Sequence, residues 1–396
     1  MNQKYVVGID MGTYHVKVAI IEESNERGGS PQIIGSGHAE SKGMRYGYII
    51  STDEARESIK TALRQAEQAA GVTVREAMLA VGGVSLDSIS TSGSVIVSRG
   101  DGEVSDIDIN RLNESLEENL PAPEIVNKRI LHTIPQRYFL DGKPLTGSPI
   151  GLTGVKLECH TLFITCFEQH LHDLIDVVES LGVSVTDIVA SPLAAGLVTL
   201  TSAQKMAGCV LANIGSETVT VVVYEDNLPI SLTVLPIGSN DITNDIALGL
   251  KIPLDEAQAL KHGNVSGVQS ASGVRVSKKK LSDIINARLT DIFELINAHL
   301  KKIKKDGILP AGVILTGGGS SLAGTDMLAK DILELPAKTS NLRLANNQSG
   351  IRDASWSVVY GLGVIGLSNG EDRTLGINHA QEGGSRLWQW FKQFLP

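Results

Sequence analysis

Two copies of one local pattern, half a chain apart, constrain the fold of this sequence most strongly. In each copy a β-branched run ends in a glycine-containing turn and a second run follows, at residues 5–10 and 15–21 and again at 209–214 and 218–224. Such runs, bounded by Gly, Asn and Asp, are typical of strands joined by a tight turn. Amphipathic helical segments alternate with them, so we predict an α/β chain with two duplicated lobes and a cleft between the halves.

Length and composition narrow the class of protein. The 396 residues exceed a single core, and 42% hydrophobic with 20% charged residues supports packed lobes. A net charge of -9 provides no basic field for nucleic acid, which is not an expected partner. The three cysteines lack CxxC spacing, which favours a reducing cytoplasm. No apolar run reaches the roughly 20 residues of a membrane span, although attachment to a membrane surface stays possible.

The two turns carry residue types that suit phosphate binding. Asp10 ends a strand and precedes Gly12 and Thr13, so backbone N–H groups and a hydroxyl can face phosphate oxygens while the carboxylate holds Mg²⁺ through water. The turn that begins at Asn213 is equivalent, although either turn alone could be a plain hairpin. The predicted cofactor-binding residues of these turns are Asp10, Gly12, Thr13, Tyr14, His15, Asn213, Gly215, Ser216, Glu217 and Thr218.

A third element lies at residues 313–321, where the apolar run VILT meets three glycines and two serines. Glycines lack a Cβ and let the backbone pass close to a base or ribose, and a following helix N-terminus favours anions. The alternative is a flexible loop between a strand and a helix. The predicted binding residues here are Gly317, Gly318, Gly319 and Ser320.

The order and spacing of these elements resemble the nucleotide site of the actin superfamily, and within it the chain is most similar to the FtsA family of bacterial cell-division proteins. Stretches 151–158, 191–195 and 236–246 support the resemblance. It implies an actin-like, ribonuclease H-like fold of two lobes, an inserted FtsA-type 1C subdomain, and ATP and Mg²⁺ as cofactors. It also implies that Gln258 and Lys261 approach the ribose or adenine, although a solvated helix face is the alternative.

The same resemblance, with the composition of the segments, predicts the division of the chain. The expected parts are 1–83 (first part of subdomain 1A, lobe 1), 84–160 (inserted 1C), 161–205 (second part of 1A), 206–367 (lobe 2, with 2A and with 2B at about 251–310), 368–384 (flexible linker) and 385–396 (amphipathic membrane-targeting helix).

Departures from the family pattern concentrate where charge meets phosphate. The family usually has a lysine two residues after the first turn's threonine, where this chain has His15. Asn213 replaces the usual acid of the second turn and cannot serve as a carboxylate base, so no catalytic residue is assigned. Ser216 and Glu217 replace glycines, and Glu217 adds negative charge near the phosphates unless it turns away or reaches the metal. We therefore predict ATP binding with at most slow hydrolysis.

The last twelve residues form a strongly amphipathic pattern. At 100° per residue the large apolar side chains share one arc and the cations lie outside it, which is typical of a helix at an anionic membrane surface. Docking on the protein's own core or on a partner is the alternative. The predicted membrane residues are Arg386, Leu387, Trp388, Trp390, Phe391, Lys392, Phe394 and Leu395.

A basic cluster opens the predicted helix at about residues 277–305. A solvated face is the ordinary meaning of such a cluster, but the resemblance implies that this region receives the acidic C-terminal peptide of FtsZ, the tubulin-like division polymer. The predicted peptide-binding residues are Arg275, Lys278, Lys279, Lys280 and Arg288.

The resulting functional prediction is an ATP-binding, actin-like protein that polymerises on the cytoplasmic side of the inner membrane at the septum. It would tether FtsZ filaments there and help recruit later divisome membrane proteins. The alternatives are a PilM-like adaptor of pilus assembly and an actin-fold ATPase or kinase.

Overall fold

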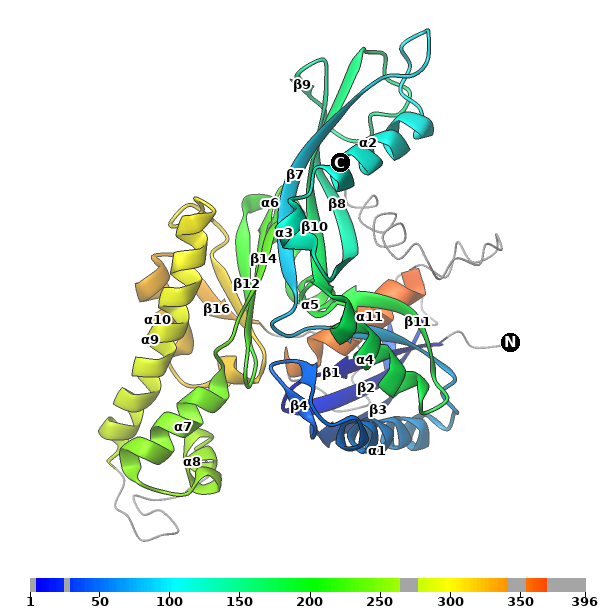
Figure 1. Cartoon of the computed structure of the whole chain (residues 1–396). Coiled ribbons are helices and arrows are strands. Elements are labelled where there is room, and N and C mark those ends of the chain that lie inside the picture. Colours follow the sequence, from blue (N-terminus) through cyan, green and yellow to red (C-terminus); the bar gives the residue numbers. More distant parts are fainter. Residues whose placement is uncertain (1–4, 25–28, 264–276, 341–353, 369–396) are drawn as a thin grey trace.

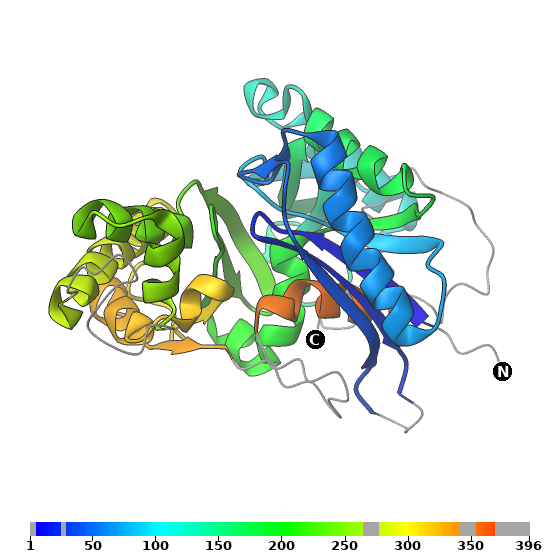
Figure 2. The ribbon, with the colours of Figure 1, turned by 90° about the horizontal axis from the view of Figure 1, so that it is seen from below.

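The computed structural model describes residues 5–24, 29–263, 277–340 and 354–368 (Figure 1). They form two lobes, each built on a five-stranded sheet, and a subdomain inserted into the first lobe. Figure 2 shows the two lobes side by side, with helices on their outer faces. Among the described residues, no helix is both long enough and apolar enough to span a bilayer.

Lobe 1 has the strand order β11-β6-β1-β2-β3. Alternate residues of β2 face opposite sides of the sheet: Val18 and Ile20 belong to the core that contains α1, whereas Ala19 and Ile21 pack with α11. The elements of lobe 1 are β1 (Tyr5–Met11), β2 (His15–Glu22), β3 (Gln32–Glu40), β4 (Met44–Arg45), β5 (Tyr48–Ile49), α1 (Thr52–Ala70), β6 (Glu76–Val81), α4 (Glu168–Glu179), β11 (Ser184–Ala190), α5 (Ser191–Thr199), η2 (Ala354–Trp356) and α11 (Ser357–Ser368).

Lobe 2 repeats this topology, with the order β14-β13-β12-β15-β16. In both lobes a central strand pairs antiparallel with the strand that follows it and parallel with a later one. The elements of lobe 2 are α6 (Ser202–Ala207), β12 (Cys209–Ile214), β13 (Val219–Glu225), β14 (Leu228–Leu235), α7 (Ser239–Leu250), α8 (Leu254–Lys261), α9 (Lys278–Lys302), β15 (Val313–Thr316), η1 (Gly318–Ser321), α10 (Thr325–Leu333) and β16 (Ala337–Thr339).

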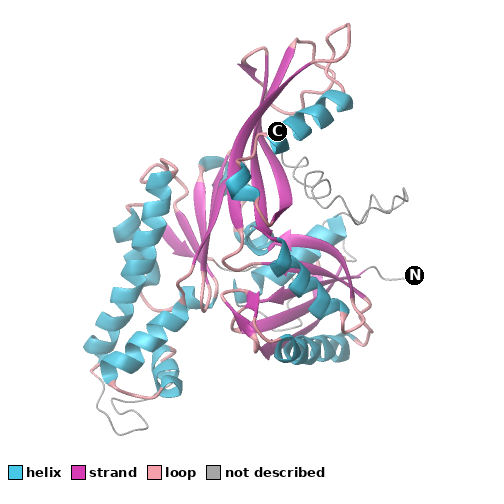
Figure 3. Ribbon diagram, viewed as in Figure 1, coloured by secondary structure: helices cyan, strands magenta, loops and turns pink. Residues whose placement is uncertain are grey.

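The inserted subdomain is a four-stranded sheet, β7-β10-β8-β9, with its own apolar core, and its long strands extend away from lobe 1 (Figure 3). It consists of β7 (Asp87–Ile96), α2 (Asp106–Glu118), α3 (Ala122–Ile125), β8 (Lys128–Leu140), β9 (Lys143–Pro144) and β10 (Lys156–Phe167). The expected boundary at residue 160 falls within β10, which pairs with β8 along its whole length. Likewise α11, expected in lobe 2, packs on β1 and β2 of lobe 1.

Candidate functional site

The two predicted phosphate turns have the same backbone geometry. A Cβ added at Gly12 would lie 2.9 Å from the His15 carbonyl oxygen, and one added at Gly215 would lie 2.9 Å from the Thr218 carbonyl oxygen. Each turn therefore needs glycine at this position, because an ordinary side chain would strike the turn's own backbone. The duplication predicted from the sequence extends to the details of the turns.

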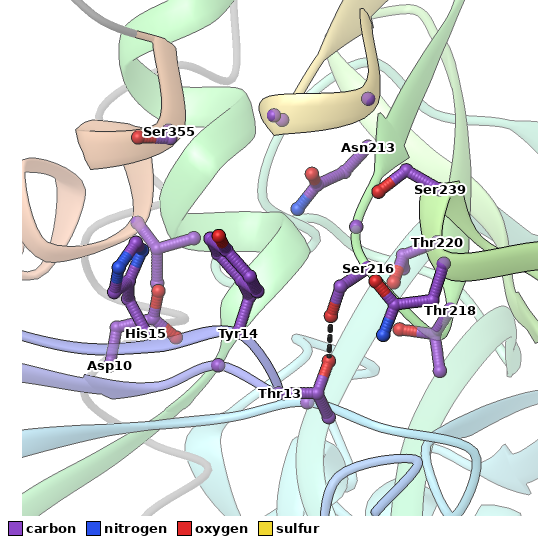
Figure 4. Close-up of a pocket in the computed structure, with 18 of the residues that line it drawn as sticks. Asp10, Thr13, Tyr14, His15, Asn213, Ser216, Thr218, Thr220, Ser239 and Ser355 are labelled. Carbon is purple, nitrogen blue, oxygen red and sulfur yellow. Dashed lines mark hydrogen bonds between the residues drawn. The ribbon is translucent and has the colours of Figure 1, made fainter. Parts of the chain in front are cut away.

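A cavity of about 460 Å³ opens between the lobes and is lined by both turns. Figure 4 shows their side chains converging from β1 and β2 on one side and from β12 and β13 on the other. The predicted site residues that line it are Asp10, Gly12, Thr13, Tyr14, His15, Asn213, Gly215, Ser216, Thr218, Gln258, Lys261, Gly317, Gly318 and Gly319. Only Glu217 and Ser320 of the predicted cofactor set do not line it.

Lys17 is a cavity residue that the sequence argument missed. It lies directly opposite Asp10 in the β1–β2 ladder and two residues beyond His15, so strand alternation places it on the same side as His15. Its Nζ donates to the Ser355 carbonyl at 2.7 Å and lies 5.9 Å from the centre of the Trp356 ring. The cavity thus contains a lysine, although the expected position holds His15. The alternation of β2 was the signal that could have identified it.

On the lobe 1 side of the cavity, the pKa values of Asp10 and His15 are both shifted in the direction that favours the neutral form. Burial raises the pKa of the Asp10 carboxyl, and the opposing charge of Lys17 only partly offsets this. The pKa of His15 is lowered by burial and then by the nearby Lys17 and His38, so its imidazole is neutral at pH 7. His15 packs edge-on against Tyr14 at 4.5 Å between ring centroids. Lys17, not His15, therefore brings positive charge to this wall.

The glycine loop is packed closely against the second turn. Gly317 has φ 83°, and a Cβ there would lie 2.2 Å from the Asn213 side-chain oxygen. A Cβ on Gly319 would meet Ile214 at 2.4 Å, whereas Gly318 faces open space. Ser320 is buried and its Oγ donates to the Gly317 carbonyl at 2.8 Å, which stabilises the loop. Ser320 thus shapes the site without facing the cavity.

Gln258 and Lys261 reach the cavity from α8. The Lys261 Nζ donates to the Ser239 carbonyl at 2.9 Å and to Thr243 Oγ1 at 2.7 Å, and Thr243 in turn donates to Gln258 Oε1. Burial lowers the pKa of Lys261 to about 8. Within the described part of the chain, Lys261 bonds to neutral oxygens and forms no ion pair with a carboxylate, and a buried lysine without such a partner is costly. An anionic or oxygen-rich ligand in the cavity would compensate it.

Glu217 turns away from the cavity. Its Oε2 accepts the Tyr46 backbone N–H at 2.6 Å and faces a second cavity of about 430 Å³ that adjoins the first. The negative charge expected beside the phosphates is therefore directed at lobe 1 backbone. Ser216 also crosses the cleft, because its hydroxyl hydrogen-bonds that of Thr13 at 2.7 Å (Figure 4).

The predicted peptide-binding cations are not equivalent. Lys278 and Lys279 are exposed at the start of α9, whereas Lys280 Nζ donates to the Gly249 carbonyl at 2.8 Å. Arg288 forms a bidentate salt bridge with Asp245, in which Nε donates to Oδ2 at 2.7 Å and Nη2 donates to Oδ1 at 3.0 Å. Arg275, residues 369–384 of the predicted linker and the predicted membrane helix at 385–396 lie outside the described residues, whereas Ser368, the expected first residue of the linker, ends α11.

Comparison with known proteins identifies the class first. A solved PilM–PilN complex of type IV pilus biogenesis matches with TM-score 0.68 and 16% identity, over 92% of this chain and 99% of that one. MreB5 of Spiroplasma citri bound to AMPPNP matches with TM-score 0.55 and 12% identity, over 95% and 100%. At such identities the likeness establishes the fold alone. This is a protein of the actin-like class, as the sequence predicted.

The family follows from sequence. The model of cell division protein FtsA matches residues 210–361, and that of the SHS2 domain inserted in FtsA matches residues 83–165. FtsA of Bacillus subtilis is 31% identical over 402 residues, covering 96% of this chain and 88% of that protein. FtsA of Pseudomonas aeruginosa is 28% identical, covering 91% and 88%. The chain belongs to the FtsA family of cell-division proteins, which confirms the family resemblance and the inserted subdomain.

Proposed function

We propose that the cavity between the lobes binds ATP, and that this binding controls the assembly of the protein. The convergence of both glycine turns, the glycine loop and two lysines on one cavity supports this most directly. Turn backbones and lysines suit phosphate oxygens, and the open space beside Gly318 lets a base or ribose approach the backbone.

The residues fit a magnesium nucleotide. A buried carboxylate with a raised pKa is costly when ionised, and a bound cation would stabilise its charged form. No group of three His, Cys, Asp or Glu that could hold a metal occurs in the described part of the chain. Asp10 would therefore hold Mg²⁺ together with water and phosphate oxygens, as is usual for this ion. Bound Mg²⁺ would neutralise phosphate charge, and Lys17 and Lys261 would add to that effect.

We propose that hydrolysis is slow, because Asn213 occupies the position where a carboxylate could activate water. An amide orients a water but does not take its proton. Phosphate release by the purified protein, compared with an Asn213→Asp variant, tests this. We expect little release from the parent and a several-fold gain in the variant. Turnover at ordinary enzymatic rates by the parent, lost in Asp10→Asn, would contradict the proposal.

At the membrane, we propose that the protein polymerises and tethers FtsZ filaments through the helix predicted at residues 385–396, at the septum, and so helps to recruit later divisome proteins. Family membership and the amphipathic pattern of residues 385–396 support this. One short helix binds lipid weakly, and several copies in a polymer raise avidity without new contacts.

Co-sedimentation with anionic vesicles, with and without ATP, tests the tether. Two matched variants add the same charge to opposite sides of the predicted helix, Trp388→Glu on the apolar arc and Gln389→Glu on the polar side. We expect the parent and Gln389→Glu to pellet, more so with ATP, and Trp388→Glu to stay in solution. Equal sedimentation of both variants would count against the membrane helix.

For the FtsZ peptide, we propose that Lys278 and Lys279 provide the steering charge, since Arg288 is already paired with Asp245. Reversing both charges should weaken binding of the acidic peptide and flatten its salt dependence. Reversal of Lys301 and Lys302, at the other end of α9, is the matched control. Equal effects of the two reversals would show that only net charge matters.

A further inference from the structure

Two adjacent residues of the second turn connect lobe 2 to lobe 1. The Ser216 hydroxyl bonds that of Thr13 at 2.7 Å, and the Glu217 carboxylate accepts the Tyr46 backbone N–H at 2.6 Å. Both connections are made by side chains, so a turn with glycine at these two positions would lack them.

The turn is held firmly on the lobe 2 side. At the start of α7, the N–H groups of Ser239 and Asn240 donate to the carbonyls of Gly215 and Ser216 at 2.9 and 2.7 Å. These helix N–H groups have no partner within the helix, so the turn satisfies them. A Cβ on Gly238 would come within 2.4 Å of the Ser216 carbonyl oxygen. The turn and α7 therefore move as one body.

The receiving segment in lobe 1 is held equally firmly. The Tyr46 carbonyl accepts the Val84 N–H at 3.0 Å, and Tyr46 itself has φ 50°, an uncommon conformation for a non-glycine residue. Gly47 is packed against Gly83, where an added Cβ would lie 2.4 Å from the Gly83 Cα. The hairpin of β4 and β5 is thus fixed on the loop whose glycines line the main cavity.

The Glu217 bond lies where the two cavities adjoin. Ser216 and Gly47 line the main cavity, Glu217 and Tyr46 line the second, and Asn240 and Gln258 line both. Elsewhere the lobes are joined by packing where α5 meets β12 and β13, and by a long hydrogen bond from Thr316 Oγ1 to the Ala354 carbonyl at 3.4 Å. The insertion adds hydrogen bonds between Ser88 and the Leu232 backbone at 2.7 and 2.8 Å. A single bond between two firm bodies allows rotation about it, but two bonds from adjacent residues restrict that rotation.

We propose that Ser216 and Glu217 are positioning residues that clamp the two lobes together at the mouth of the main cavity and slow the exchange of its ligand. The carboxylate strengthens the clamp, because hydrogen bonds to charged groups are the stronger ones. The inference deepens the proposed function, but closure of the lobes can be measured without nucleotide.

The first test measures the distance between the lobes by electron–electron double resonance on nucleotide-free protein. Spin labels go on cysteines introduced by Gln68→Cys on α1 and Leu248→Cys on α7, both at exposed positions. The three native cysteines are buried, and burial raises the pKa of Cys166 and Cys209 to about 12, so they resist labelling.

The clamp predicts a narrow distance distribution in the parent and a longer, broader one in the Ser216→Ala, Glu217→Ala double variant. Glu217→Gln keeps an acceptor oxygen and should remain close to the parent. Glu294→Ala removes an exposed acid of α9 and serves as the control. An unchanged distribution in the double variant would overturn the proposal.

The second test follows release of a fluorescent ATP analogue in the stopped flow. Loss of one charge-assisted hydrogen bond should speed release roughly ten-fold in Glu217→Ala, with Glu217→Gln in between. Release from Glu217→Ala at the parent's rate would also overturn the clamp. If the parent bound no analogue, the proposed ATP site would fail, and the distance measurement alone would decide on the clamp.

Discussion

The phosphate turn of lobe 1 and its counterpart in lobe 2 share a backbone but not their charges. In lobe 1, Asp10 lies opposite Lys17 in the β ladder, and at the same register in lobe 2 Asn213 lies opposite Thr220. Two ionisable residues, Asp10 and Lys17, in lobe 1 thus correspond to two neutral polar residues in lobe 2. Duplication has kept the geometry that glycine requires, while the residues at the cavity wall have diverged.

The comparison separates two tasks. Lobe 1 carries charges suited to phosphate and metal, with Asp10 desolvated and Lys17 beside it. Lobe 2 contributes one cation, Lys261 of α8, but at its turn it contributes shape, through the packing of Gly317 and Gly319, and the side chains that cross the cleft. The second turn has no charged pair at its ladder position, and it forms two hydrogen bonds across the cleft. Both features agree with the proposal that the protein binds its nucleotide firmly and hydrolyses it slowly.

The largest expected effect comes from making the first turn resemble the second. Asp10→Asn removes the carboxylate and should weaken magnesium-dependent ATP binding by roughly 100-fold, as expected for a lost charged contact in a desolvated site. It should also raise the thermal stability of the nucleotide-free protein at pH 7, because an ionised buried carboxylate is costly. Titration calorimetry and thermal unfolding measure these effects. Asn213→Ala, the counterpart in lobe 2, should alter binding far less, and equal losses would remove the proposed asymmetry.

A smaller effect is expected at the facing ladder position. Lys17→Met keeps the length of the side chain and removes its charge, so affinity for ATP should fall roughly ten- to thirty-fold. Thr220→Val is the matched change in lobe 2 and should leave affinity nearly unaltered. Fluorescence titration with an ATP analogue compares them. If the Lys17→Met protein kept normal thermal stability and bound ATP almost as tightly as the parent, the charge of Lys17 would not contribute to ATP binding. The role of the lysine would then be structural, through contacts such as those with Ser355 and Trp356.

The smallest effect concerns the inserted subdomain, which only lobe 1 carries. His132 of β8 is buried, and its Nε2 accepts the Ala190 N–H at 3.0 Å, which joins the insertion to lobe 1. Burial lowers its pKa from 6.5 to about 4. Between these values the unfolded chain binds the proton and the folded protein does not. The stabilisation is therefore complete above pH 6.5 and is lost as the pH falls towards 4.

At pH 5.5 the loss of folding free energy, relative to a pH well above 6.5, is about 1.4 kcal/mol. His132→Asn keeps an acceptor oxygen but does not titrate, so its urea midpoint should fall less between pH 7.5 and 5.5 than that of the parent. Other histidines titrate in both proteins, and the difference between the proteins isolates His132. Identical shifts would show that His132 titrates normally in the folded state.

Much of the site was predictable because its residues are local in sequence. Each turn needs glycine and small polar residues within a few positions, and those patterns are readable directly. Strand alternation could have placed Lys17 on the same side as His15, but which side of β2 borders the cavity depends on how the two lobes pack together. The direction of Glu217 was left open because a side chain's partner across a cleft depends on the packing of both lobes.

The boundaries show the same limit. Strand β10 crosses the expected edge of the insertion because pairing with β8 and β7 continues to Phe167 and Asp87. Helix α11 follows lobe 2 in the chain, yet it packs on β1 and β2, where Gly8 allows the approach of the Val359 backbone. The order of elements in the sequence does not reveal which of the two sheets an apolar helix packs against, because each sheet offers an apolar face.

The sequence by itself determined the duplicated α/β pattern, the family and the composition of the turns, because periodicity, glycine placement and spacing are properties of neighbouring residues. Only the tertiary structure decided which charges face the cavity, which cations are already paired, and that Ser216 and Glu217 cross the cleft. These depend on contacts between residues as far apart as Tyr46 and Glu217. Such contacts exist only once both lobes have folded and met.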